Sequence, residues 1–344
     1  MGHLFSKERK LNLLNWLKGK NLKVWLVVSL SGVLLAYTII ESGIEWGSLK
    51  MTPSQLFFLI AAMLVLLISI WVQSLRVAIP WHIYFKSKNP ETLSSLLIGS
   101  FYNDILPGNL GEIMRARHFS NKNNTSFIRS LASQFVEKYI DALNFIIYAA
   151  FFCFLYKDST LSLNNLIALV VIITVIFVLY LAIITSKKME RFALSGLFHF
   201  FSPGRFLYKL HYNIKLFLLS LTCKKMLNYL LFGYFMFALN IVQYYLVMYS
   251  VNLPKALVSL KIAFGLAVAM IVVYIIPSAP GKTGVVHFSI YTVMYWFAIS
   301  LGLPETLAVK QSLATYAIYV HLSYFVPEVI VGALVVLNER KRVF

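Results

Sequence analysis

Long apolar segments recur along the chain, and their length limits the fold more than any other feature. Runs of about 17–25 apolar residues match a bilayer core about 30 Å thick, because an α-helix rises about 1.5 Å per residue. Such runs occur at 24–40, 55–75, 139–156, 161–185, 226–251, 256–276 and 285–301. Only 13% of the residues are charged, which is about half the share of an average soluble domain. The sequence therefore predicts an all-α polytopic membrane protein.

Basic residues outnumber acidic ones by 31 to 13, and their positions predict the orientation of the chain. Most of them lie in the stretches 1–23, 76–88, 115–129, 187–225 and 340–342. By the positive-inside rule these stretches and both termini are cytoplasmic. No convincing cleavage pattern follows the first apolar run, so we expect an uncleaved anchor in the inner membrane. Because the positive charge lies between apolar runs, it indicates membrane topology and not a nucleic-acid partner.

Segment 93–106 does not fit a simple series of spans. It is apolar but too short to cross a bilayer, it contains Asn103 and Asp104, and basic sequence lies on both sides of it. A re-entrant hairpin entering from the cytoplasm fits better, with its irregular turn buried in protein or lining a wet cavity. Region 256–301 is either two full spans or a second re-entrant pair entering from outside. In total we expect about six full spans and two hairpins.

A short motif with the spacing P-G-x-x-G occurs twice, almost half the chain length apart. Its turn residues are Pro107, Gly108 and Gly111 in the first copy and Pro280, Gly281 and Gly284 in the second. Each copy interrupts an apolar region, because Pro removes a backbone donor and Gly permits left-handed conformations. Interrupted segments at corresponding places in two halves indicate a midplane binding site between inverted repeats. The alternative is that both motifs mark ordinary loops between helices.

Charged residues follow the first motif at a depth where charge is costly. They are Glu112, Arg115 and Arg117, followed on the next long helix by Glu137 and Asp141. Charge near the bilayer centre implies pairing, a water-filled cavity or a function. One interpretation is a structural set of ion pairs at the cytoplasmic boundary. The other adds a phosphate-bearing ligand, for which Arg offers a planar bidentate fork.

The second motif carries Lys282 at its turn and His287 about one helical turn later. Lys282 is a candidate phosphate contact, and an imidazole titrates near neutral pH. Packing is the alternative for His287, as it is for His321 and Glu328 in the last helix. The chain has none of the common catalytic or nucleotide-binding motifs, and its histidines are scattered. We therefore expect no metal and no cofactor.

The chain divides into a basic amphipathic segment, 1–23, and one transmembrane domain, 24–344. Within the domain we expect a first half, 24–160, with its motif at 107–117, and a second half, 226–344, with its motif at 277–287. A cytoplasmic linker, 187–225, joins them and is partly amphipathic. Such basic amphipathic stretches favour anionic lipid surfaces. A solvated loop that only fixes topology is the alternative for the first segment.

Three motifs together resemble the transmembrane-region family of lysylphosphatidylglycerol synthases. They read Pro107-Gly108-x-x-Gly111-Glu112-x-x-Arg115, Glu137-x-x-x-Asp141 and Pro277-x-x-Pro280-Gly281-x-x-Gly284. The resemblance covers roughly 20–340 and implies a flippase-like domain with two re-entrant hairpins. The second motif of the family usually reads Pro-Gly-Gly-x-Gly-x-x-Glu, so Lys282 and His287 replace its Gly and Glu. His321 lies near the place of a late-helix Arg that is typical of the family.

These observations favour translocation of a phospholipid or a polyprenyl-phosphate-linked lipid through a polar cleft. The substrate-binding residues would be Asn103, Asp104, Glu112, Arg115, Arg117, Glu137, Asp141, Lys282 and His287. An enzyme that modifies a lipid headgroup, with Glu112, Glu137 or Asp141 as general base, is the alternative. A third interpretation is a scaffold for a synthase or glycosyltransferase. The expected partners are membrane lipids, above all anionic ones, with a homo-oligomer or a partner enzyme left open.

Overall fold

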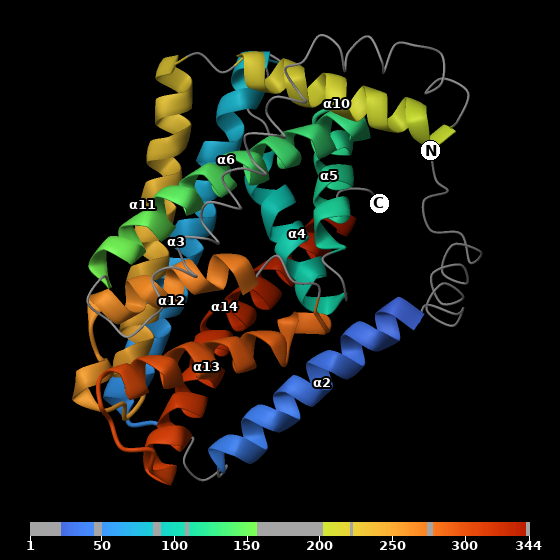
Figure 1. Cartoon of the computed structure of the whole chain (residues 1–344). Coiled ribbons are helices and arrows are strands. Elements are labelled where there is room, and N and C mark those ends of the chain that lie inside the picture. Colours follow the sequence, from blue (N-terminus) through green and yellow to red (C-terminus); the bar gives the residue numbers. More distant parts are fainter. Residues whose placement is uncertain are drawn as a thin grey trace.

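A computed structural model describes residues 22–44, 50–84, 91–106, 110–156, 202–220, 223–273 and 278–341 of the chain. These residues form helices joined by short turns and contain no strand, which confirms the predicted all-α class (Figure 1). In chain order the elements are α2 (Leu22–Ser42), α3 (Pro53–Tyr84), α4 (Thr92–Ile105), α5 (Gly111–Lys122), α6 (Phe127–Leu155), α10 (Ser202–Ser220), α11 (Cys223–Tyr249), η2 (Lys255–Leu257), α12 (Leu260–Val273), η3 (Pro280–Lys282), α13 (Val285–Ser300) and α14 (Leu307–Lys341).

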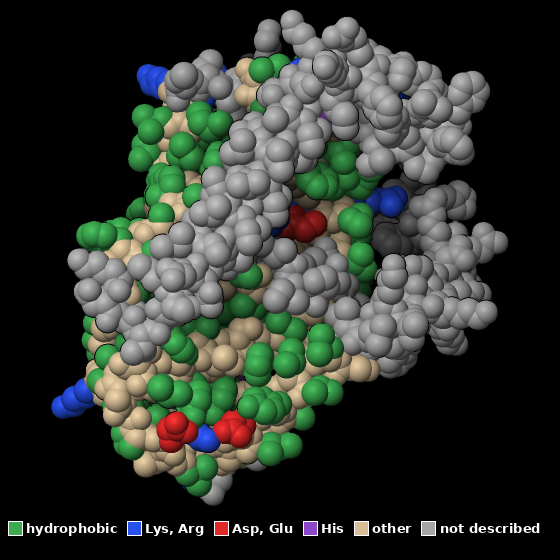
Figure 2. All heavy atoms as spheres, viewed as in Figure 1, with side chains coloured by type: hydrophobic (Ala, Val, Ile, Leu, Met, Phe, Trp, Pro, Cys, Tyr) green, Lys and Arg blue, Asp and Glu red, His purple; other side chains and the backbone are tan. Residues whose placement is uncertain are grey.

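Four helices of the described part are long and apolar enough to cross a membrane. They are α3, α6, α11 and α14, with candidate spans of 26 to 33 residues. Three of them contain the predicted runs 55–75, 139–156 and 226–251. Large apolar side chains on their outer faces, such as Phe57, are exposed as a lipid-facing surface requires (Figure 2). The protein is therefore a multi-pass membrane protein. Run 161–185 lies outside the described residues, so the expected number of spans remains a prediction.

Four shorter helices form two hairpins, α4 with α5 and α12 with α13. These helices have between 12 and 16 residues, or about 18–24 Å at 1.5 Å per residue, less than a bilayer core. For region 256–301 these lengths favour the hairpin over two full spans. The end of α4 packs against η3, so the tips of the two hairpins lie side by side (Figure 1). Their entry from opposite membrane faces remains a prediction.

The apolar core has two parts. The larger part joins buried side chains of α3, α4, α6 and α11–α14. The smaller part surrounds Trp81 and Phe119, where the buried face of α10, including Phe217, packs against α3 and α6. Helix α10 lies across one end of the bundle (Figure 1). Of the expected amphipathic segments 1–23 and 187–225, residues 1–21, 187–201 and 221–222 lie outside the described residues.

Helix α2 packs closely against the second motif. Ala279 N–H donates to Ser31 Oγ at 3.0 Å, and Lys310 Nζ pairs with Glu41 Oε1 at 2.5 Å. Gly284 has a φ of +87°, and a Cβ there would lie 1.9 Å from the carbonyl oxygen of Ser31. Only glycine therefore fits this position. The motif turn is held by backbone contact with α2 as well as by its own hairpin.

Candidate functional site

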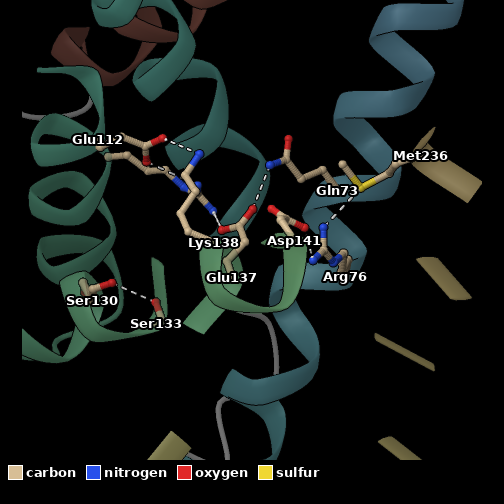
Figure 3. Close-up of polar contacts among 10 residues, drawn as sticks. Gln73, Arg76, Glu112, Ser130, Ser133, Glu137, Lys138, Asp141 and Met236 are labelled. Carbon is tan, nitrogen blue, oxygen red and sulfur yellow. Dashed lines mark hydrogen bonds and ion pairs between the residues drawn. The ribbon is translucent and has the colours of Figure 1, made fainter. Parts of the chain in front are cut away.

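Seven polar side chains from three helices meet beside the first hairpin. We call them the α6 network: Gln73 and Arg76 from α3, Glu112 and Arg115 from α5, and Glu137, Lys138 and Asp141 from α6 (Figure 3). Residues 137, 138 and 141 share one side of α6 because a helix turns every 3.6 residues. Residues 112 and 115 share a side of α5 for the same reason. The network thus brings together four of the predicted site residues.

Direct pairs connect α5 with α6 inside the network. Arg115 Nη2 lies 2.6 Å from Glu137 Oε2, and Arg115 Nη1 lies 3.6 Å from Glu112 Oε2. Lys138 Nζ lies 3.1 Å from Glu112 Oε1. Gln73 Nε2 donates to the second oxygen of Glu137 at 2.8 Å. Both oxygens of Glu137 are therefore satisfied, as a buried carboxylate requires.

Arg76 extends the network to the neighbouring helices. Its Nη2 lies 2.5 Å from Asp141 Oδ1, and its guanidinium lies over the ring of Tyr229, 4.3 Å from the centroid. Its Nη1 makes a weak hydrogen bond to Met236 Sδ at 4.0 Å. Arg76 Nε has no hydrogen-bond partner among the described residues. Arg76 thus retains donor capacity in a buried position.

The α6 network is balanced in charge, with three cations and three carboxylates. Its centre is closed, since the side chain of Glu137 is 3% exposed. Its edge is open, because the side chains of Lys138 and Asp141 are 62% and 39% exposed. Asp141 is the middle residue of α6, about 21 Å from either end at 1.5 Å per residue. Charged groups are therefore accessible at half the height of a candidate span.

Arg117 does not join this network. It is exposed on α5, and a spacing of two residues places it on the side of the helix away from Arg115. The sequence grouped Arg115 and Arg117 together, whereas the described contacts include only Arg115.

The first motif builds the turn between α4 and α5. Gly111 N–H donates to Asn103 Oδ1 at 2.7 Å, so the amide of Asn103 closes the hairpin. A Cβ at Gly111 would lie 2.0 Å from the carbonyl oxygen of Gly99, and glycine is therefore required for the close contact of the two helices. Asn103 has this backbone partner, and its role in substrate binding stays a prediction. Pro107 and Gly108 lie outside the described residues.

A second polar cluster lies where the tips of the hairpins meet. We call it the hairpin junction: Asp104 on α4, Lys282 on η3 and Glu328 on α14. The two carboxyl groups lie in hydrogen-bonding range of each other, and both interact electrostatically with Lys282. The Lys282 Nζ lies 5.7 Å from the centroid of the Tyr324 ring. Lys282 has a φ of +55°, a left-handed conformation that costs an L-residue about 1–2 kcal/mol.

Two buried histidines support the turn of the second motif. Their ring centroids lie 4.5 Å apart. His321 Nε2 lies 2.7 Å from the carbonyl oxygen of Gly281, and Gly284 N–H donates to His287 Nδ1 at 3.4 Å. Two of the three positions that depart from the family pattern, His287 and His321, are thus neighbours in space. These contacts fit the packing alternative for both histidines.

The open end of the first hairpin is fixed to the end of α14. Lys122 pairs with Glu339, and His118 Nε2 lies 3.9 Å from the same carboxylate. Ser95 Oγ on α4 lies 2.9 Å from His118 Nδ1. Burial lowers the pKa of His118, although Glu339 acts in the opposite direction. The imidazole is therefore neutral at pH 7, and Lys122 forms the charged contact.

Sequence reasoning did not propose Gln73, Arg76, Lys138 and Glu328 as site residues. Gln73 and Arg76 are three residues apart at the end of the apolar run 55–75. This spacing places two polar side chains on one helix face, and it was the feature of the sequence that could have indicated them. Lys138 follows Glu137 directly, but only the structure shows that it reaches Glu112. Glu328 could be assigned to the hairpin junction only once the structure showed α14 packed against α4.

The described residues show no metal centre at these clusters. No group of three or more His, Cys, Asp or Glu side chains among them could hold a metal ion. A hollow of about 430 Å³ on α11 is lined by Asn228, Leu231, Phe232 and Phe235. None of these belongs to the α6 network or the hairpin junction, so the expected polar cleft remains a prediction.

The sequence model of the lysylphosphatidylglycerol synthase TM region matches residues 24–332. The chain belongs to this family. The match includes both hairpins, the α6 network and the hairpin junction, and it confirms the family suggested by the three motifs. No curated protein and no solved structure matches the chain. The family relates the protein to membrane lipids, and a specific activity has to be inferred from its own residues.

Proposed function

We propose that this family member translocates a phosphate-bearing lipid, either a phospholipid or a polyprenyl-phosphate-linked lipid. The headgroup passes along the α6 network while the hydrocarbon chains stay in the bilayer. We further propose that the protein lies in the inner membrane with both termini in the cytoplasm. In this arrangement the halves 24–160 and 226–344 contribute one re-entrant hairpin each, related as an inverted repeat.

The observation that carries this proposal is the open edge of the α6 network. A charge at the centre of a membrane helix costs at least about 2.5–3.5 kcal/mol on insertion scales. Ion pairs that served only packing would avoid part of this cost by complete burial, yet Lys138 and Asp141 are partly exposed. Figure 2 shows acidic side chains near the middle of the visible face. A polar headgroup in transit needs such a place.

The geometry assigns different parts to the charged side chains. Lys138 is the most exposed cation, and a phosphate would compete with Glu112 for its ammonium group. Arg115 and Arg76 supply guanidinium donors behind it, and Arg binds phosphate in bidentate geometry. The carboxylates hold these cations at fixed positions when no headgroup is present. The network as a whole is neutral, because its three cations already pair with its three carboxylates. A phosphate therefore binds one of these cations favourably only when it takes the place of a carboxylate.

The same contacts argue against the enzyme alternative. A general base must be free to accept a proton from its substrate. Glu112, Glu137 and Asp141 each pair with an Arg or a Lys, so none of these carboxylates is free for a substrate unless its pair breaks. We therefore prefer translocation to headgroup chemistry.

Transport of labelled lipids in proteoliposomes tests the proposal, with Arg115→Gln compared with Arg117→Gln. The two residues lie on one helix, but only Arg115 is in the network. We expect Arg115→Gln to lower the rate at least about tenfold, because a charge-assisted hydrogen bond contributes about 1.5–3 kcal/mol. The exposed control, Arg117→Gln, should keep the rate within about twofold, since surface substitutions change free energies by only about 0.5 kcal/mol.

Lys138→Gln is the second variant, because Lys138 is exposed and its replacement leaves the packing intact. It should lower the rate for anionic lipids more than for zwitterionic ones. Equal rates for wild-type and empty vesicles, with both neutral and anionic headgroups, would refute translocation. Loss of a modified lipid from a deletion strain, with leaflet distribution unchanged, would instead support the enzyme.

A further inference from the structure

The hairpin junction contains a buried carboxyl group that the α6 network does not explain. Asp104 is 2% exposed, and neither of its side-chain oxygens accepts a hydrogen bond from a donor in the described part of the chain. A buried carboxylate without donors is strongly unfavourable. A carboxyl group in such a position either binds a ligand or takes up a proton and becomes neutral.

The neighbours of Asp104 indicate which of these occurs. The carboxyl of Glu328 lies in hydrogen-bonding range, but two ionised carboxylates are both acceptors and repel each other. A bond between them requires one proton. Ser100, one helical turn before Asp104, also lies in hydrogen-bonding range of Glu328. Because Glu328 has this second donor, the proton belongs on Asp104 and the charge on Glu328.

The other groups around Asp104 and Glu328 can balance only one negative charge. Lys282 interacts with both carboxyls and balances one of them. Tyr324, on α14, interacts with both as a neutral phenol. The charged side chains of α3 and α5 that face inward, Arg76 and Arg115, are paired within the α6 network. Two carboxyls therefore face one ammonium group.

We propose that Asp104 and Glu328 form a proton-binding site at the meeting point of the two hairpins, and that its occupancy controls whether the tips stay together. With the proton bound, α4, η3 and α14 are held by a carboxyl–carboxylate hydrogen bond and by the electrostatic attraction of Lys282. Loss of the proton creates two like charges and pushes α4 away from α14. Pro327 precedes Glu328 in α14 and removes a backbone hydrogen bond there, so the helix can yield at this point. The link to lipid movement rests on the proposed function.

Infrared spectroscopy of the purified full-length protein tests the proton site without any transport. We expect a protonated carboxylic acid band at neutral pH that shifts in D₂O. Asp104→Asn should remove this band and Glu328→Gln should shift it. Glu305→Gln, at an exposed acid that accepts from Tyr295, should leave it unchanged. Absence of the band in the wild-type protein, or its persistence in Asp104→Asn, would overturn the site. If Asp104→Asn does not fold, Glu328→Gln decides, because an unshifted band in that variant would overturn the site.

The pH dependence of lipid transport in proteoliposomes tests the coupling. Wild-type transport should change at least about tenfold across the titration of the site, which corresponds to about 1.4 kcal/mol. Transport by Asp104→Asn should be independent of pH in the same range. Parallel pH profiles of the two proteins would overturn the coupling while the infrared band still supports the site. No transport by the wild-type protein at any pH would refute the proposed function. The infrared band would still test the proton site independently.

Discussion

The α6 network and the hairpin junction both place carboxyl groups inside a membrane protein, but they differ in charge balance. In the α6 network three carboxylates meet three cations, and the buried carboxylate, Glu137, has a donor for each oxygen. Among the described residues of the hairpin junction, two carboxyls meet one ammonium group, and no donor reaches the side-chain oxygens of Asp104. The first arrangement is complete without a ligand, whereas the second needs a proton.

Because of this difference, the α6 network holds the first hairpin in place, whereas the hairpin junction can change its state. A network in which every charge is paired resists change, because removing one member leaves another uncompensated. A cluster with one excess carboxyl responds to a single proton. The polar residues that hold the first hairpin on α6 are therefore distinct from those that respond where the hairpins meet. Mutations at the two places should differ in size and in sign.

The largest effect is expected for Glu137→Gln. It leaves the guanidinium of Arg115 without its closest carboxylate in a buried position, and breaking a buried ion pair costs about 3–5 kcal/mol. Thermal unfolding in detergent should show a large drop in apparent Tm. The matching change at the junction, Asp104→Asn, should be close to neutral, because it removes a group that is already uncharged. Similar losses in both variants would contradict the difference in charge balance.

A smaller loss is expected for Gly284→Ala, which tests whether the second hairpin is held by backbone fit. The added Cβ would lie 1.9 Å from the Ser31 carbonyl oxygen, and overpacking typically costs about 1–3 kcal/mol. Gly302→Ala is the matched control, since Gly302 has a φ of +68° but no neighbour within 4 Å. It has only the backbone strain, about 1–2 kcal/mol. Equal shifts in Tm would show that α2 yields to the new side chain.

Run length and motif spacing predicted much of this fold. The apolar runs at 55–75, 139–156 and 226–251 gave three of the long helices, and the short segment 93–106 became α4. Of the charged residues after the first motif, Glu112 and Arg115 meet Glu137 in the network, whereas Arg117 does not. Glu112 and Arg115 share a helix face, as do Glu137 and Asp141. These are local properties, which helical periodicity makes visible in the sequence.

Contacts between distant helices could not be predicted in the same way. Periodicity shows which side chains share a face but not which helix that face meets, so Arg76 was expected only as a topology signal. Arg117 was grouped with Arg115 because nothing in the sequence shows which of the two faces α6. Glu328 lies far from Asp104 in sequence, and only the packing of α14 against α4 brings them together.

The smallest effect, and the one that depends on pH, is expected for Lys282→Gly. Glycine relieves the left-handed strain at φ +55°, a gain of about 1 kcal/mol that is partly lost to the greater freedom of Gly in the unfolded chain. Removing the ammonium group also makes the remaining carboxylate less favourable, so the folded variant holds its protons more tightly than the wild-type protein. By linkage, its stability relative to wild type then falls as pH rises.

Apparent Tm measured across pH should show the Lys282→Gly variant equal to or slightly more stable than wild type in acid and less stable in alkaline buffer. Lys282→Gln keeps the strain and removes only the charge, so its curve should run parallel to that of Lys282→Gly but lower. If all three proteins followed the same pH dependence, Lys282 would not balance the Asp104–Glu328 pair.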